Sequence, residues 1–202
     1  LDYKTVLKFK HKVKHVVCSL GVGAHLEYWG FKSETITELN WWEHHQPDSD
    51  IKLTATPARH FTGRGVKRGK TLWSSFVLNM HGYQLFLGGD SGYDAQFKKI
   101  GEQFGPFDLA FLECGQYGKY WPNIHMFPEE TVQAAMDLNA AIVFPVHWAK
   151  FALSNHTWNE PIKRFIAEAG KKNQNYISPL IGQTYVLGDL FEQKEWWNHL
   201  QP

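Results

Sequence analysis

The sequence predicts one α/β domain, because apolar segments typical of buried strands alternate with helix-like segments along the chain. Several of the strand-like segments end in Gly, Asp or His. The chain has 202 residues, of which 43% are hydrophobic, so it can bury a core of ordinary size. Its sequence shows neither an internal repeat nor a linker, and we therefore expect residues 1–202 to form a single domain.

Apolar runs and polar–apolar alternation predict the strands. In chain order they lie in residues 14–21, 35–43, 50–60, 72–89 (a hairpin), 107–115, 141–148 and 184–189. Pro57 interrupts the alternation of the third segment, because proline cannot donate a hydrogen bond to a neighbouring strand. The sequence NMHG at 79–82 is the expected turn of the hairpin.

Helical periodicity predicts helices at 24–31, 95–105, 128–140 and 160–170. In the second of these, Phe97, Ile100 and Phe104 fall on one face, and a Gly-Pro pair ends the helix. The third begins with Pro128 and carries acidic residues in its first turn, where the helix dipole favours them.

Charge and cysteine content argue against several classes of function. There are 21 basic and 20 acidic residues, so the overall charge gives no support for nucleic-acid binding. Cys18 and Cys114 lie in apolar runs and do not make a disulfide framework, which favours buried free thiols in a reducing compartment. No apolar run is long enough to span a membrane, and residues 1–20 lack a signal-peptide core, so the expected location is the cytoplasm.

Three predicted strands end in side chains that could bind a metal. His60, Asp90 and His147 follow the runs LTATPAR, LFLGG and IVFPV. Sites in α/β domains gather at strand ends, and imidazole and carboxylate are ligands of zinc and similar metals. Each residue also has a structural explanation, since a lone His is commonly hydrogen-bonded and Asp90 could accept the N–H groups of a turn. His125, in NIHMFPEE, could simply adjoin a helix cap, so a metal centre and ordinary structural roles both stay open.

Longer blocks of sequence carry a resemblance to a known family. The chain resembles the N-acylphosphatidylethanolamine-hydrolysing phospholipase D family of the metallo-β-lactamase superfamily in TPARHFTGRG, LWSSFVL, GGDSGYDAQFKKIGEQFGPFDLAFL, HMFPEETVQAAMDL and HWAKFAL, which occur in the family's order up to about residue 170. The resemblance implies an αββα sandwich with a two-zinc centre at one edge. It implies that His60 binds one zinc, that His147 binds the other, and that Asp90 bridges them. It places His125 in the substrate cleft, where it could contact the phosphate or transfer a proton, so Asp90 and His125 are the expected catalytic residues.

The chain departs from the family at its amino-terminal end. The family has an H-x-H-x-D-H motif that supplies two histidines to one zinc and an Asp and a His to the other, and no segment here matches it. LDYKTV, at the start of the chain, resembles the segment that directly follows this motif. We therefore expect the chain to begin just after the motif and the N-terminal part of the sandwich to be missing. Each metal would keep at most two of the three or four ligands that zinc usually needs, so we expect weakened metal binding.

The resemblance implies a metal-dependent hydrolase, most closely a phosphodiesterase of phospholipase D type that acts on N-acylphosphatidylethanolamine-like lipids. A hydroxide formed from metal-activated water would attack phosphorus, with zinc as the cofactor. Two alternatives stay open, namely a lactonase or other ester hydrolase on the same scaffold, and a non-catalytic truncated remnant. The expected partner is a small-molecule or phospholipid substrate and not nucleic acid.

Other segments could make contacts with metal, lipid or protein, each beside a simpler explanation. Substitute metal ligands are conceivable in WWEHHQPD (41–48), which holds Glu43, His44, His45 and Asp48, although this polar run favours a solvated loop. The basic run GRGVKRGK (63–70) could meet an anionic membrane surface or be a solvated loop. An acyl groove could be lined by Trp73, Trp121, Trp148 and Phe151, which could equally belong to the core. The tail FEQKEWWNHLQP could pack on the domain or mark a surface contact, and peripheral membrane contact and a homodimer both stay open.

Overall fold

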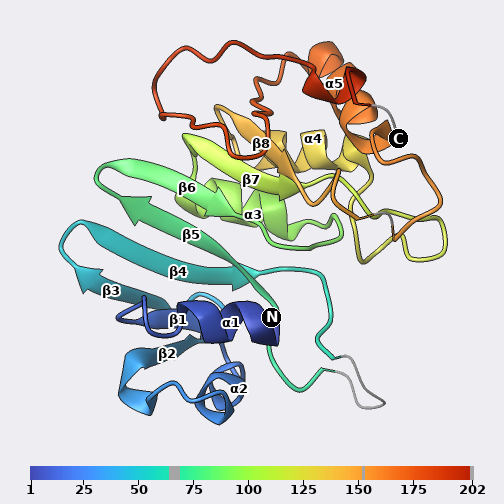
Figure 1. Cartoon of the computed structure of the whole chain (residues 1–202). Helices are drawn as coiled ribbons and strands as arrows, with labels where there is room; N and C mark the ends of the chain where they lie inside the picture. The colour runs from blue at the N-terminus through green and yellow to red at the C-terminus, as the bar shows by residue number, and fades with distance from the viewer. Residues whose placement is uncertain (64–68, 152, 201–202) are drawn as a thin grey trace.

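A six-stranded mixed sheet, in the order β3-β4-β5-β6-β7-β8, forms the frame of the molecule (Figure 1). The computed structural model describes residues 1–63, 69–151 and 153–200. The strands of this sheet are β3 (His44–Asp48), β4 (Ile51–Pro57), β5 (Ser74–Met80), β6 (Tyr83–Leu87), β7 (Leu109–Glu113) and β8 (Val143–Val146). Neighbours from β3 to β6 are antiparallel, whereas β6, β7 and β8 are parallel.

The strands from β4 to β8 lie within segments that the sequence predicts as strands. Pro57 is the last residue of β4, as its missing N–H predicts. The hairpin turn also falls where expected, at His81 and Gly82. Both have a positive φ, of 50° and 85°, as a two-residue turn of type I′ requires.

Three helices cover one face of this sheet (Figure 1). They are α3 (Gln96–Phe104), α4 (Pro128–Asp137) and α5 (Glu160–Lys172), and the sequence predicts all three. Phe97 and Ile100 of α3 join a buried cluster with Phe86 and Leu112 of the sheet. Full burial of one such side chain stabilises the fold by about 1.5–3 kcal/mol. The main core therefore lies between the helices and this face.

The amino-terminal elements form a smaller unit beside β3 (Figure 1). Its elements are α1 (Tyr3–Phe9), β1 (Val16–Ser19), α2 (Gly23–Tyr28), η1 (Ser33–Thr35) and β2 (Ile36–Leu39). β1 and β2 pair in parallel, and Val6, Leu26 and Phe31 are buried in a cluster of their own. The two strands and the helix expected in this region are therefore confirmed.

The prediction of a solvated loop at 41–48 is wrong, because this segment contains strand β3, which pairs with β4 at the edge of the sheet. Its side chains are exposed, apart from the half-buried His45. Polar side chains and a proline are typical of edge strands, which must avoid pairing with other chains. The same polarity made the segment resemble a loop.

The prediction of a last strand at 184–189 is also wrong, because these residues form an irregular segment. The outer edge of β8 is already paired with residues that come earlier in the chain. The N–H of Val143 donates to the carbonyl of Asn175, and the N–H of Ile177 donates to the carbonyl of Val143. The apolar residues of 184–189 are used elsewhere, along a groove.

The groove lies on the face of the large sheet opposite the helices. Phe111 and Phe144 lie side by side on this face, Leu85 lies on the neighbouring strand β6, and all three are only half-buried. Together with parts of the segment 178–187 they line a groove of about 710 Å³. The tail that follows packs on the domain, since Trp197 of η2 (Trp196–Asn198) is 1% exposed and contacts Trp148.

Three further predictions concern single features. Both cysteines are free, but only Cys114 is buried as expected, while Cys18 is half-buried. Within the described ranges, no helix combines the length and apolar character needed to cross a membrane. Residues 64–68 of the basic run lie outside the described residues.

Candidate metal centre

Four strands of the large sheet direct their carboxyl ends to the same edge. β4 and β6 both run antiparallel to β5, so they run parallel to each other, and β7 and β8 continue the direction of β6. His60 follows β4, Asp90 follows β6 and His147 follows β8. The topology therefore brings the three predicted metal ligands to one edge of the sheet.

His125, from the loop between β7 and α4, lies between the other two histidines. Its ring centroid is 5.1 Å from that of His60 and 5.3 Å from that of His147. The Nε2 atom of His147 is 3.7 Å from Oδ1 of Asp90. The structure thus brings together all four residues that the sequence singles out. Their assignment as ligands and catalytic groups stays a prediction.

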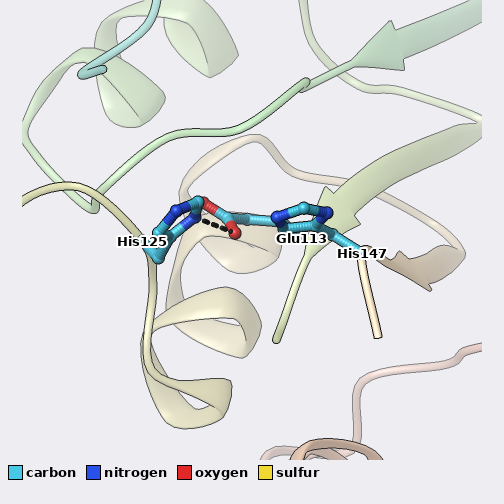
Figure 2. A group of neighbouring side chains, drawn as sticks. All are labelled: Glu113, His125 and His147. Atoms are coloured by element: carbon cyan, nitrogen blue, oxygen red, sulfur yellow. Dashed lines mark hydrogen bonds and ion pairs between the residues drawn. The ribbon is translucent and has the colours of Figure 1, made fainter. Parts of the chain in front are cut away.

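Glu113, the last residue of β7, is a site residue that the sequence-based prediction missed. It is fully buried, and its Oε2 atom lies 2.7 Å from Nδ1 of His125. Ligand atoms of Glu113, His125 and His147 lie within 4.8 Å of one another, close enough to hold a metal ion (Figure 2). The run FLECG contained a signal, because a carboxylate in a buried apolar strand is costly unless it is paired.

Two glycines after β6 shape the loop that carries Asp90. A Cβ on Gly88 would lie 2.7 Å from the backbone oxygen of Phe111, so a side chain there would force β6 and β7 apart. Gly89 has a φ of +63°, in the left-handed region. Trp73 donates its indole N–H to the carbonyl of Asp90 at 2.7 Å, and its ring stacks on His60 at 4.4 Å between centroids. This tryptophan therefore holds both the Asp90 loop and the His60 ring.

The backbone after β8 is strained where it enters the site. His147 and Ala149 have φ values of 64° and 72°, in the left-handed region that residues with a side chain rarely adopt. Such a conformation costs about 1–3 kcal/mol and persists only where the surroundings hold it. Gly115 packs directly against this turn, since a Cβ there would lie 2.3 Å from the backbone oxygen of His147. Close packing against Gly115 therefore holds this strained turn at the site.

Burial sets the protonation state of the three histidines. It lowers the pKa of His60, His125 and His147 below the ordinary value of 6.5, and the charge of Asp90 opposes this shift without reversing it. The rings are therefore neutral at pH 7, which is the form that binds metals. Burial raises the pKa of Glu113 well above its ordinary value of 4.5, and the negative charge of Asp90 raises it further.

The donor set fits a divalent cation, because neutral imidazoles and carboxylates are the ligands that zinc and similar metals take in proteins. The substitute ligands considered in 41–48 do not take part. His45 stacks on His15 at 5.1 Å between ring centroids. Among the described residues, the close group of ligand atoms includes none of Glu43, His44, His45 and Asp48.

Known proteins resemble this chain in both sequence and fold. The family model described as a beta-lactamase superfamily domain matches residues 1–148. An uncharacterized protein of Mycobacterium tuberculosis is 40% identical over 181 residues, which make up 88% of this chain and 48% of that protein. The mitochondrial N-acyl-phosphatidylethanolamine-hydrolyzing phospholipase D of Saccharomyces cerevisiae is 38% identical over 162 residues, or 75% of this chain and 35% of that protein. The chain thus spans half the length of these relatives or less.

A solved structure extends the likeness to the fold. Igni18, a metallo hydrolase from Ignicoccus hospitalis, matches with a TM-score of 0.69 at 17% identity, over 87% of this chain and 70% of that chain. The predicted fold class, α/β of metallo-β-lactamase type, is confirmed. Since the family model also covers most of the sequence, the chain belongs to the beta-lactamase superfamily.

Proposed function

We propose that this domain is a metal-dependent hydrolase, and specifically a phosphodiesterase of phospholipase D type acting on N-acylphosphatidylethanolamine-like lipids. The observation that carries the proposal is the convergence of His60, Asp90, His125 and His147 from separate segments at one sheet edge. The similarity to the yeast enzyme, at 38% identity, supports the choice of reaction and substrate.

The proposed ligands divide between two zinc ions. His60 would bind one ion and His147 the other, with Asp90 shared between them. Bound zinc would supply Lewis acidity and an acidified water molecule. The neutral state of the histidines supports this assignment, because burial lowers their pKa values below 6.5.

His125 is the residue best placed for proton transfer. Its side chain is 13% exposed, so it reaches the site surface while most of the ring is fixed by packing. Burial lowers its pKa, so the ring is neutral at pH 7 and can accept a proton from water or hold one for the leaving oxygen. By holding a cation, Asp90 and His147 would place a phosphoryl group beside this ring, because the His147 ring lies 5.3 Å from it between centroids.

The groove on the open face of the sheet supports a lipid substrate. Its volume of about 710 Å³ falls within the range of ligand sites, and apolar side chains dominate its lining. His147 and Trp148 lie on its wall, so the groove begins at the proposed metal centre. An acyl chain in the groove would place its headgroup at the strand ends.

Trp148 alone of the four aromatic residues considered for an acyl groove lines this one. The other three have different surroundings in the structure. Trp73 stacks on His60, Trp121 donates its indole N–H to the carbonyl of Gln116, and Phe151 is 67% exposed. Peripheral contact with a membrane surface would bring the substrate to the groove.

Metal analysis and a set of substrates test the proposal. The purified chain is titrated with zinc and assayed on N-acylphosphatidylethanolamine, a lactone and a simple phosphodiester. Because these residues give each zinc at most two ligands, we expect cleavage of both phosphodiesters only with excess zinc, and its loss in His147→Asn. The control is His44→Asn, which changes an exposed histidine on the edge strand. Turnover of the lactone alone would favour an ester hydrolase, and a chain that binds no zinc would favour a non-catalytic remnant.

A further inference from the structure

Glu113 is a buried acidic residue that is not among the proposed ligands of the two zinc ions. It ends β7 and has an exposed fraction of 0%. Its neighbours Leu112 and Cys114 are equally buried. Transfer of a carboxylate from water into such surroundings costs several kcal/mol unless hydrogen bonds replace the lost water. The hydrogen bonds of this carboxylate should therefore explain why it is buried.

Three groups surround the carboxylate. The backbone N–H of Ser91 donates to Oε1 at 2.7 Å, and Nδ1 of His125 lies 2.7 Å from Oε2. The backbone N–H of Met126 also donates to this group. Ser91 follows Asp90 in the chain and Met126 follows His125, so one buried carboxylate connects the two loops that carry site residues. Burial and the charge of Asp90 raise the pKa of Glu113, whereas the N–H donors of Ser91 and Met126 oppose this shift and favour the ionised carboxylate.

The same contacts argue against Glu113 as a metal ligand. Oε2 is occupied by His125, so binding a cation there would break a contact of 2.7 Å. Glu113 also lies beneath the site, fully buried, whereas the His125 and His147 side chains are 13% and 33% exposed and form its surface. Figure 2 shows the carboxylate turned toward the His125 ring.

We infer that Glu113 is a positioning residue, whose carboxylate accepts the Nδ1–H of His125 and so fixes both the orientation and the tautomer of that ring. With the proton held on Nδ1, the other ring nitrogen, Nε2, is left with a free lone pair. A carboxylate that holds an imidazole in this way also stabilises the imidazolium formed when Nε2 takes up a proton. This tautomer requires an ionised carboxylate, because a protonated Glu113 would instead donate its O–H to Nδ1.

The catalytic consequence rests on the proposed function. In phosphodiester hydrolysis, Nε2 of His125 would take a proton from the attacking water as its oxygen bonds to phosphorus. The resulting imidazolium keeps its Nδ1–H on Glu113. It then returns the Nε2 proton to the oxygen of the leaving alcohol as the P–O bond breaks. Protons balance over the cycle, and Glu113 neither gains nor loses a proton in it.

The tautomer can be measured directly, without any assumption about substrate. The full chain is labelled with ¹⁵N-histidine, prepared without metal, and the His125 signals are assigned by comparison with His125→Gln. We expect the ¹⁵N shifts of a ring protonated at Nδ1 and unprotonated at Nε2. In Glu113→Gln the preference for this tautomer should be lost. A wild-type ring protonated at Nε2 would overturn the inference, and this result needs no variant of Glu113 to fold.

Kinetics and metal content separate positioning from ligation. For folded Glu113→Gln we expect kcat to fall by about 10–100-fold, as when a hydrogen-bond partner of a site histidine is lost. KM and the zinc content should stay within about twofold of wild type. The matched control is Glu130→Gln, since Glu130 accepts the N–H of Phe127 at the start of α4 and lies outside the group of ligand atoms described above. Loss of zinc in Glu113→Gln would make Glu113 a ligand and refute the positioning role.

The two proposals fail in different ways. If no substrate is turned over, the proposed function fails while the NMR result still decides the inference. If turnover is normal in Glu113→Gln, the positioning role fails while the proposed function stands.

Discussion

The two faces of the six-stranded sheet differ in how completely they are covered. Under the helices, Phe86, Ala110 and Leu112 are fully buried. On the opposite face, Phe111 and Phe144 stack at 5.2 Å between ring centroids, yet both are only half-buried and line the groove. The difference indicates that the helix-covered face supplies most of the stability. The open face and the strand ends beside it are the part of the sheet available for a ligand.

The largest expected effect compares one phenylalanine from each face. Phe86→Ala should lower the free energy of unfolding by about 3–5 kcal/mol, because it leaves a cavity in a closed core. Phe111→Ala should cost about 1–2 kcal/mol, because Phe111 is already partly in water. Urea unfolding of both variants measures the difference. Equal losses would mean that the open face is covered in solution, and the contrast between the faces would be lost.

At the strand ends, a substitution should change activity and leave stability nearly unchanged, unlike the substitutions on the two faces. Asp90→Asn should lower zinc-dependent turnover by more than about 10²-fold. Loss of a residue that only hydrogen-bonds to a metal ligand typically costs about 10–100-fold, and loss of a ligand shared by both metals should cost more. Its stability should change by less than about 1 kcal/mol, because Asp90 lies outside the core. The control is Asp94→Asn, whose side-chain oxygen can still accept the N–H of Gln96. Turnover in Asp90→Asn close to that of the control would remove Asp90 from the metal centre.

The covered face was also the part of the molecule most open to prediction from sequence. Apolar periodicity predicted α3, α4, α5 and the strands from β4 to β8. Residues that face one core must be apolar, so their spacing in the sequence follows the period of the helix or strand. The two wrong predictions of secondary structure concern segments outside that core. The polarity of β3 reflects its edge position, and the strand-like pattern at 184–189 reflects contact with the groove and not pairing.

The strand pattern predicted the candidate site only where its residues follow strands, and the family resemblance added His125. His60, Asp90 and His147 stand at strand ends, and their convergence follows from strand direction. Glu113 was missed because it lies inside a buried run, where its partners come from loops distant in sequence. Its contact with His125 depends on tertiary structure, and composition indicated only that a buried carboxylate needs some partner.

Within the open face, a smaller effect on lipid turnover should distinguish a residue that lines the groove from a neighbour that does not. Leu85 and Leu78 pair across β5 and β6, and both are half-buried, but only Leu85 lines the groove. Leu85→Trp should lower kcat/KM for a long-chain lipid by about tenfold, the size of effect expected for a misfit in an apolar pocket. Leu78→Trp is the matched control. Cleavage of a short phosphodiester should not change in either variant, and an equal loss in both would show that the groove does not bind the acyl chain.

The smallest effect is a pH dependence at the strand ends, where the two faces meet. Burial lowers the pKa of His60 below 6.5, so below about pH 7 the unfolded chain binds a proton that the folded chain excludes. The free energy of unfolding of the metal-free protein should therefore fall as the pH is lowered through 6.5 toward the folded pKa. The limit for one group is about 1.4 kcal/mol per pH unit, and partial exposure of His60 makes its share smaller. In His60→Gln this share should vanish, whereas Phe111→Ala should keep the wild-type slope because it removes no titrating group. Urea unfolding at pH 7.5 and 5.5 gives both slopes, and an unchanged slope in His60→Gln would show that this ring is not held neutral by the fold.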